Sequence, residues 1–366
     1  MRGTPSTPEV SAQRACVSGL TRSVLPVQSG RLIRTGMLVD LIMNAPKLTV
    51  SLLTIVLMQA SAIGQSIPKP GIKEVQVPYS SLKLSMTLKI GGTADWVLVT
   101  SDAVWVASTN PYDIVRVDPM TNKILARVRI PGEACSGLAF GFDSVWVPIC
   151  GSRPALVRID AKKNALSATL PIAPAGEEGG IAASDDSVWL VSDKVGSLVR
   201  VDPFTNSGRQ RISIPPGSFN PAFDGGTVWI TGVESNVLTA VDATSGTVLE
   251  SIRVGSKPRF LAAGAASVWT LNQGDGTISR VDEKGRQVTT IQVGIPGTGG
   301  DIAFGADSIW TSVFEVPLTR IEAKTNRVVK QWIGEGGDSL RIGFGSVWIT
   351  DYKKGLLSRI PMEEVN

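Results

Sequence analysis

The chain has 366 residues, no histidine and three cysteines, so Ser-His-Asp or Cys-His catalysis, His-ligated zinc or haem, and a Cys-only zinc site are excluded. Residues 1–62 hold six of the 36 basic residues and two of the 32 acidic ones, which leaves 30 of each sign in residues 63–366. Because residues 63–366 carry no net charge, electrostatics gives no support to a nucleic-acid partner, and we do not expect the protein to bind nucleic acid.

The start of the chain has the features of an export signal. Residues 43–62 place Lys47 before the apolar run 48–58, and Ala60-Ser61-Ala62 offers small residues for a signal peptidase. The run is too short to span a bilayer of about 30 Å, so we expect no membrane span after cleavage. We therefore predict a leader at 1–42 that is either disordered or an over-called start, a signal peptide at 43–62, a linker at 63–81, and a periplasmic or secreted protein.

A unit of about 40 residues then repeats seven times. The tryptophan motifs "AVWVAS", "SVWVPI", "SVWLVS", "TVWITG", "SVWTLN", "SIWTSV" and "SVWITD" are centred on Trp105, Trp146, Trp189, Trp229, Trp269, Trp310 and Trp348. Each unit contains four short runs rich in Val, Ile, Thr and Trp, bounded by turn residues, which predicts strands. Seven such units predict an all-β, seven-bladed β-propeller over residues 82–362.

The two ends of the repeat array predict how the ring closes. The last unit has only three strands, whereas a spare strand, "LKLSMTLKIGG", precedes the first unit at 82–92. We expect residues 82–90 to complete the last blade as its outermost strand. Seven positions before each repeated tryptophan, the innermost strand carries a small residue in five of the seven blades, and Arg341 occupies that position in the last. We expect the tryptophans themselves to be core.

Residues that recur in most blades are interpreted as structural. The third strand ends in an acidic residue in six blades: Asp118, Asp160, Asp202, Asp242, Asp282 and Glu322. These carboxylates can accept N–H groups of the following turn. Arginines lie two residues earlier, on the same strand face, and we expect them to pair with carboxylates across blades: Arg116, Arg158, Arg200, Arg280, Arg320 and Arg359.

Cys135 and Cys150 occur in one blade only. Counting back from a turn at Phe142 and Asp143 places the two cysteines opposite each other in a hairpin, which favours a disulfide over two free thiols. A catalytic cysteine is not expected without a histidine to activate it.

Polar residues that break the repeat lie in loops before the first strand and after the second strand, and both sets of loops open on one face around the central channel. Glu133, Glu177 and Glu178 are among them. The ligand-binding candidates are Asp95, Asn220, Arg259, Asn272, Asp301, Phe314, Asp338, Arg341, Asp351 and Tyr352. Carboxylates, amides and guanidinium groups around a channel suit a polar small molecule, or Mg²⁺ or Ca²⁺ bound through oxygens; a solvated rim of compensating charges is the alternative for each residue.

The unit "VGSKPRFLAAGAASVWTLNQGDGTISRVDEKGRQVTTIQVG" and its copies resemble the YVTN-repeat and streptogramin-lyase-like (virginiamycin B lyase-like) β-propellers. The resemblance implies the architecture more than the activity, because enzymes and non-enzymes share such blades. Streptogramin lyases open a lactone with a histidine base and magnesium, and that base has no counterpart here.

Two functions follow from these observations. We expect a monomeric, exported, non-catalytic propeller that binds a small molecule, glycan, peptide or partner protein through its loop face, without a cofactor. The alternative is a metal-dependent lyase or lactone hydrolase that uses carboxylates such as Asp301 and Asp338 in place of histidine.

Overall fold

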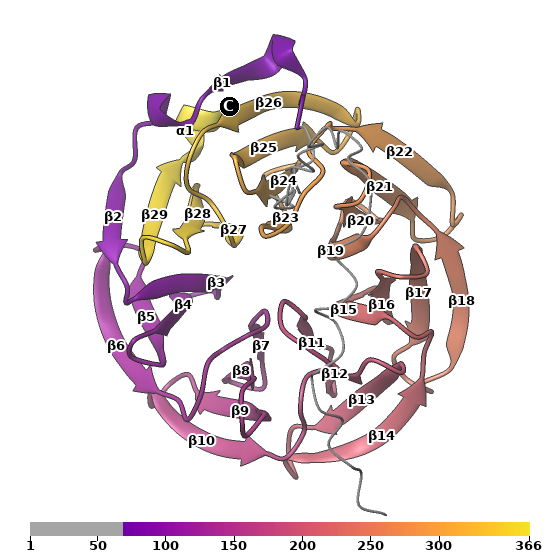
Figure 1. Ribbon diagram of the computed structural model, residues 1–366. Coiled ribbons are helices and arrows are strands. Elements are labelled where there is room, and N and C mark those ends of the chain that lie inside the picture. The colour runs from indigo at the N-terminus through magenta and orange to yellow at the C-terminus, as the bar shows by residue number, and fades with distance from the viewer. Residues whose placement is uncertain (1–68) are drawn as a thin grey trace, which may run out of the picture. The chain divides into compact units, whose positions relative to one another are not determined.

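The computed structural model describes residues 69–366, which form a ring of seven β-sheets (Figure 1). The leader and signal peptide predicted at 1–62 lie outside the described residues. In the described part, no helix is both long and apolar enough to cross a membrane. The all-β, seven-bladed propeller predicted from the repeat is therefore confirmed.

Each blade is an antiparallel sheet whose strands run outward from the axis in chain order. The first two blades consist of β3 (Thr93–Val99), β4 (Val104–Thr109), β5 (Asp113–Asp118) and β6 (Lys123–Arg129), then β7 (Ala139–Gly141), β8 (Ser144–Ile149), β9 (Ala155–Asp160) and β10 (Ala165–Leu170). The third and fourth consist of β11 (Ile181–Ala183), β12 (Val188–Asp193), β13 (Ser197–Asp202) and β14 (Ser207–Ser213), then β15 (Ser218–Asp224), β16 (Thr227–Gly232), β17 (Val237–Asp242) and β18 (Val248–Arg253).

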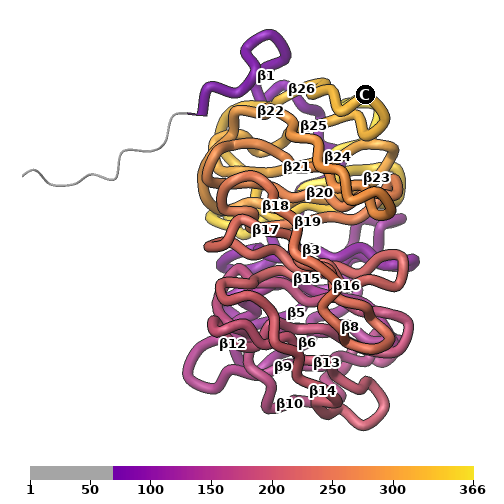
Figure 2. Tube along the Cα trace, turned by 90° about the vertical axis from the view of Figure 1, so that its right-hand side faces the viewer, coloured from indigo at the N-terminus to yellow at the C-terminus, as the bar shows by residue number. Residues whose placement is uncertain are grey.

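The remaining blades follow the same order. The fifth and sixth consist of β19 (Pro258–Gly264), β20 (Ser267–Asn272), β21 (Thr277–Asp282) and β22 (Val288–Gln292), then β23 (Asp301–Gly305), β24 (Ser308–Val313), β25 (Val316–Glu322) and β26 (Arg327–Ile333). The seventh contains β27 (Leu340–Gly343), β28 (Ser346–Asp351) and β29 (Leu356–Pro361), and the short helix α1 (Met362–Val365) follows it. Figure 2 shows the ring from the side.

Ring closure follows the prediction. Strand β2 (Met86–Lys89) pairs antiparallel with β29, with Leu88 opposite Leu357, and so supplies the missing outer strand of the seventh blade. The strand is shorter than the predicted 82–90. Because β2 comes from the start of the propeller and β29 from its end, one sheet holds both ends of the ring.

The segment expected as a linker contributes a strand of its own. Within its described part, residues 69–81, the 3₁₀ turns η1 (Lys73–Val75) and η2 (Tyr79–Ser81) flank β1 (Gln76–Pro78). Strand β1 runs parallel to β26 and makes the sixth blade five-stranded. The Gln331 side chain fixes this segment, because its oxygen accepts from the Ile72 N–H at 2.7 Å and its nitrogen donates to the Val293 carbonyl at 3.0 Å.

The seven repeated tryptophans are core residues, as predicted, since none is more than 1% exposed. Each lies opposite the residue seven positions earlier on the innermost strand, as Trp146 does opposite Ala139 and Trp348 opposite Arg341. A small residue at that position leaves room for the neighbouring blade to pack against the sheet.

The repeated aspartates accept N–H groups of the following turn, as predicted. Asp242 Oδ1, for example, accepts from the N–H of Thr244 at 3.1 Å and of Ser245 at 2.7 Å. Hydrogen bonds from the N–H and hydroxyl groups of these turns lower the pKa values of the carboxyls at the same position in four blades: Asp118, Asp160, Asp202 and Asp242.

The prediction that the repeated arginines pair with carboxylates across blades is wrong. Each guanidinium lies over the tryptophan ring of its own blade; in the fifth blade, Arg280 Cζ is 4.8 Å from the centre of the Trp269 ring. Each guanidinium also donates to a backbone carbonyl that follows the third strand of the next blade. Arg280 donates to the carbonyl of Ala323 at 2.8 Å and to the Asn326 side chain at 3.0 Å. Where a repeated arginine does pair with a carboxylate, both residues belong to one blade, as Arg116 and Asp102 do. The planar guanidinium presents several N–H donors in a fixed arrangement, so it can bond a turn carbonyl and an asparagine side chain together.

Candidate functional site

The loops before the first strand and after the second strand open on one face of the ring, and irregular strand pairing shapes this loop face. The register between first and second strands shifts near the start of β3, β15 and β19. Asp95 and Asn220 lie within two of these shifts, and Arg259 lies within the third. A β-bulge redirects a side chain and interrupts the ladder, so these candidates are placed by departures from the regular blade.

The central channel is narrow beneath this face. Trp96 from the first blade and Phe260 from the fifth have ring centroids 6.1 Å apart, so their contact crosses the axis. A cavity of about 50 Å³ lies beside this contact, and Asn220, Asp301 and Arg341 are among its lining residues. Trp96 and Phe260 therefore narrow the channel. Trp96 is not among the residues predicted for the site, although it is one of only two tryptophans outside the seven repeated positions.

Four carboxyl groups lie near the channel mouth, where the charges of three of them act on the fourth, Asp95. We call Asp95, Glu133, Glu178 and Asp338 the acidic cluster. Burial raises the pKa of Asp95 well above its usual range, and the neighbouring Asp338, Glu178 and Glu133 raise it further. Burial also raises the pKa of Asp338 to about 7, against the stabilising Gly300 N–H, which donates to Asp338 Oδ1 at 2.9 Å. The Asp95 and Asp338 carboxyls are close enough for each to affect the pKa of the other.

Arg259 and Tyr352 lie next to the acidic cluster. Burial raises the pKa of Glu178, while the charge of Arg259 opposes that rise. Arg259 lies over the Phe219 ring at 4.6 Å. Burial first, and then the charges of Asp95, Glu133, Asp338 and Glu178, raise the pKa of Tyr352.

Asp301 and Arg341 neutralise each other beside the acidic cluster. Asp301 is 3% exposed, and its Oδ2 accepts from Arg341 Nη1 and, at 2.7 Å, from the Ser339 hydroxyl. Its Oδ1 accepts from the N–H of Ile302 at 2.8 Å. With both oxygens occupied, Asp301 holds the sixth and seventh blades together.

Both asparagine candidates are buried and hydrogen-bonded to protein. Asn220 donates to the carbonyls of Glu178 at 3.3 Å and Arg259 at 2.7 Å, so it joins the loops around the acidic cluster. Asn272 is fully buried and bonds the hydroxyls of Thr270, Thr277 and Ser279 within its own blade. These contacts support structural roles for both asparagines.

Phe314, Asp351 and Tyr352 line one cavity between the sixth and seventh blades, which we call the blade 6–7 pocket. Its volume is about 360 Å³, and it is completed by the following residues: Glu315, Gly334, Glu335, Gly336, Gly337, Lys353 and Lys354. Lys353 Nζ is 5.8 Å from the centre of the Phe314 ring. Tyr352 also responds to the charges of the acidic cluster, so pocket and cluster are neighbours.

The segment before the propeller supports two sides of this pocket. Lys69 donates to the Phe314 carbonyl and lies 3.9 Å from the Glu315 carboxylate. Tyr79 packs beside Gly334 and Gly336, and a β-carbon at Gly336 would lie 3.5 Å from the Tyr79 ring. The positive φ of 104° at Gly336 and of 75° at Gly337 suits glycine there. These contacts were not predicted, because residues 63–81 were expected to be a linker.

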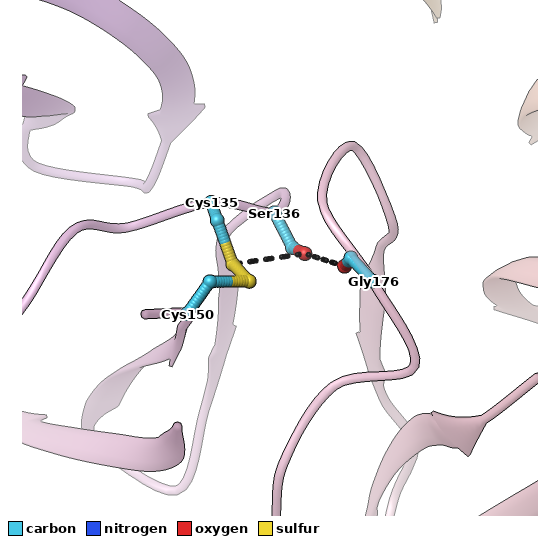
Figure 3. Close-up of a disulfide and its surroundings, with 4 residues drawn as sticks. All are labelled: Cys135, Ser136, Cys150 and Gly176. Atoms are coloured by element: carbon cyan, nitrogen blue, oxygen red, sulfur yellow. Dashed lines mark hydrogen bonds between the residues drawn. A yellow bond between two sulfur atoms is a disulfide. The ribbon is translucent and has the colours of Figure 1, made fainter. Parts of the chain in front are cut away.

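The structure contains a disulfide between Cys135 and Cys150, whose Cα atoms are 5.7 Å apart (Figure 3). The register expected from the turn does not extend as far as the cysteines. Gly141 pairs with Ser144, as expected, but Ala134 pairs with Ile149, which is a shift of two residues. The loop before β7 absorbs this shift. The Cys135 carbonyl accepts from the Glu178 N–H at 2.7 Å, and the Cys150 N–H donates to the Glu133 carbonyl at 3.1 Å. The backbones of the two disulfide cysteines thus hydrogen-bond to the backbones of two members of the acidic cluster, Glu133 and Glu178.

Metal binding has no preformed ligand set in the described part of the chain: residues 69–366 contain no group of three or more Asp, Glu or Cys side chains arranged to hold an ion.

Comparison with known proteins gives a fold and no family. No family model matches the chain, and no curated protein matches it. A solved structure described as that of a streptogramin B lyase resembles it with a TM-score of 0.61 and 14% identity, over 76% of this chain and 95% of that one. The likeness is one of fold. The YVTN-repeat assignment stays a prediction.

Proposed function

We propose that the protein is an exported, non-catalytic β-propeller that binds a polar small molecule, such as a glycan fragment, on its loop face. The observation that carries this proposal is the blade 6–7 pocket, whose volume of about 360 Å³ lies in the range of small-molecule sites. It combines two aromatic side chains with carboxylates and ammonium groups, next to the acidic cluster.

The composition of the pocket favours a ring with many hydroxyls. Phe314 and Tyr352 offer faces or edges for the apolar side of such a ring. Asp351 and Glu315 accept hydrogen bonds, while Lys353 and Lys354 donate them. Acceptors and donors occur together, which suits a neutral polar molecule better than a strongly charged one.

Export and compartment remain part of the proposal. The signal-like segment 43–62 supports export, and a disulfide between Cys135 and Cys150 suits an oxidising compartment. The balanced charge of residues 63–366 supports a binder without a nucleic-acid partner.

A thermal-shift screen of mono- and oligosaccharides, cell-wall fragments and lactones tests the proposal, since a ligand of the folded state raises the melting temperature. We expect hits whose shift is lost in Phe314→Ala. Phe204→Ala is the matched control, because Phe204 is 80% exposed in a turn on the opposite face and should leave the shift unchanged. Hits that both variants retain equally would contradict the pocket assignment.

One observation favours a second candidate function, which is proton-transfer catalysis. A carboxyl with a pKa of about 7 can act as acid or base at neutral pH, and Asp338 has that property in a chain without histidine. Asp301, the other carboxylate suggested from sequence, is already neutralised by Arg341. Turnover of a lactone or cyclic peptide that Asp338→Asn abolishes would favour a lyase or hydrolase over the binding module.

A further inference from the structure

A second cavity lies between the fifth and sixth blades, and we call it the blade 5–6 cavity. Its volume is about 680 Å³, within the range of small-molecule sites. It lies beside the turns that join first to second strands, which are on the face opposite the loop face. The lining includes three cations, one aromatic ring and two small turn residues: Arg280, Arg320, Lys324, Phe304, Ala265 and Ala306. The proposed function gives this cavity no role.

The repeat explains why this junction is hollow. Between the second and third blades, the equivalent positions hold an aromatic pair, Phe142 and Phe204, whose ring centroids are 5.9 Å apart. Phe142 lies four residues before the repeated tryptophan, and Phe204 lies two residues after the repeated acidic residue. The fifth blade carries Ala265 at the first of these positions, and the sixth blade carries Lys324 at the second. A methyl group and a flexible ammonium thus replace two rings and leave space between the blades.

The same comparison shows two N–H donors that have no acceptor. In the other four blades with a repeated arginine, the Nη2 atom donates within its own blade to a carboxylate or a carbonyl, namely those of Asp102, Phe142, Asp186 and Phe344. Arg280 and Arg320 donate from Nε and Nη1 instead. Within residues 69–366, the Nη2 atoms of these two arginines have no hydrogen-bond acceptor, so both keep N–H groups for a ligand.

The charges around the cavity favour a ligand with one negative charge. Asp307, Glu322 and Asn366 also line the cavity. Glu322 accepts from the Thr325 hydroxyl in its own turn, and Asp307 is exposed. In the described part of the chain, none of these carboxylates forms an ion pair with a cation of the cavity. Because cations and acids are balanced, a polyanion gains no net attraction, whereas one carboxylate can still bond a free guanidinium N–H.

We propose that the blade 5–6 cavity binds a small aromatic carboxylate. Its ring takes the space beside Ala265 that a phenylalanine takes in the second blade, and its carboxylate accepts from Arg280 Nη2, near the Lys324 ammonium. The chain itself shows this pairing, because the carboxylates of Asp102 and Asp186 accept from Nη2 of the equivalent arginines. Phe304 provides an aromatic wall for the ring of the ligand.

Isothermal titration calorimetry with benzoate, phenylacetate and indole-3-acetate tests this site. We expect saturable binding of at least one of these carboxylates at millimolar concentration. The matching amide should bind about tenfold more weakly, because it lacks the charge-assisted hydrogen bond to Arg280.

Ala265→Phe is the decisive variant, because its ring fills the cavity and should abolish binding. The turn can accept this ring, since Ala265 has a φ of 55° and the phenylalanines at the same position, Phe142 and Phe344, have φ values of 57° and 51°. Lys284→Phe is the matched control. It adds a ring at a turn of the same face but outside the cavity, and should leave binding unchanged.

Lys324→Glu tests the charge of the site without filling it. Lys324 is exposed in a turn, so the variant should fold. We expect it to weaken binding about fivefold, because an attraction is lost and a like charge faces the carboxylate. Should Ala265→Phe fail to fold, Lys324→Glu decides instead, and unchanged affinity in that folded variant would refute the site.

Three further results would overturn the proposal: no saturable binding of any of the three carboxylates, equal affinity for acid and amide, or binding that a folded Ala265→Phe retains. Phe314→Ala separates this site from the blade 6–7 pocket and should leave carboxylate binding unchanged. Loss of carboxylate binding in Phe314→Ala would place the ligand in the other pocket and contradict the present assignment. Failure of the carboxylate site leaves the proposed function untouched, because that function depends on the loop face.

Discussion

At the residue scale, the repeat separates what could be predicted from what could not. The roles of Trp269 and Asp282 could be predicted because each recurs at a fixed place and its partners lie within its own blade or turn. The partner of Arg280 could not, since it is the carbonyl of Ala323 in the following blade. The sequence shows that Arg280 is charged. Every residue has a backbone carbonyl, so the sequence does not show which carbonyl accepts its hydrogen bond.

The arginine contacts predict a cost for truncation. Arg280→Ala should lower the free energy of unfolding by about 1–3 kcal/mol, because it removes the cation–π contact with Trp269 and leaves the Ala323 carbonyl without its donor. Urea unfolding measures this change. Lys284→Ala, at an exposed turn position, is the control and should stay within about 0.5 kcal/mol. Equal stability of both variants would remove the role assigned to the arginines.

At the scale of strands, regular features were predictable and irregular ones were not. The closing strand β2 could be predicted because its sequence matches the fourth strand of other units. Strand β1 has no such copy, and its parallel pairing with β26 depends on the Gln331 side chain. The bulges near Asp95, Asn220 and Arg259 also escaped prediction, because the residue identities do not encode the register shift.

Equivalent isoleucines test how firmly β2 belongs to the ring. Ile90 follows β2 and Ile130 follows β6, and the N–H of each donates to a carbonyl of the loop before the third strand of its blade. They are 1% and 3% exposed. We expect Ile90→Ala and Ile130→Ala each to cost about 2–5 kcal/mol in chemical unfolding. A cost near zero for Ile90→Ala alone would mean that β2 is a loosely attached tail.

At the scale of the whole molecule, ring closure brings together acids from four blades that are far apart in sequence. Asp95 and Asp338 were candidates because they break the repeat, and the closed ring brings them close enough to affect each other's pKa. Asn272 was also a candidate but is buried within one blade, since a polar residue that breaks the repeat can equally serve its own sheet. The loop face was therefore predictable as a region, whereas the pairing of residues within it was not.

The central claim is that the blade 6–7 pocket holds the ligand, and the small number of tyrosines allows a direct measurement. The chain has three, Tyr79, Tyr112 and Tyr352, so ¹⁹F NMR of 3-fluorotyrosine-labelled protein gives one signal for each. Tyr352 lines the pocket, and Tyr112 lies on the first blade outside it. The account predicts that thermal-shift hits move the Tyr352 signal in a saturable manner and leave Tyr112 in place. Saturable binding that moves Tyr112 and leaves Tyr352 unchanged would contradict it.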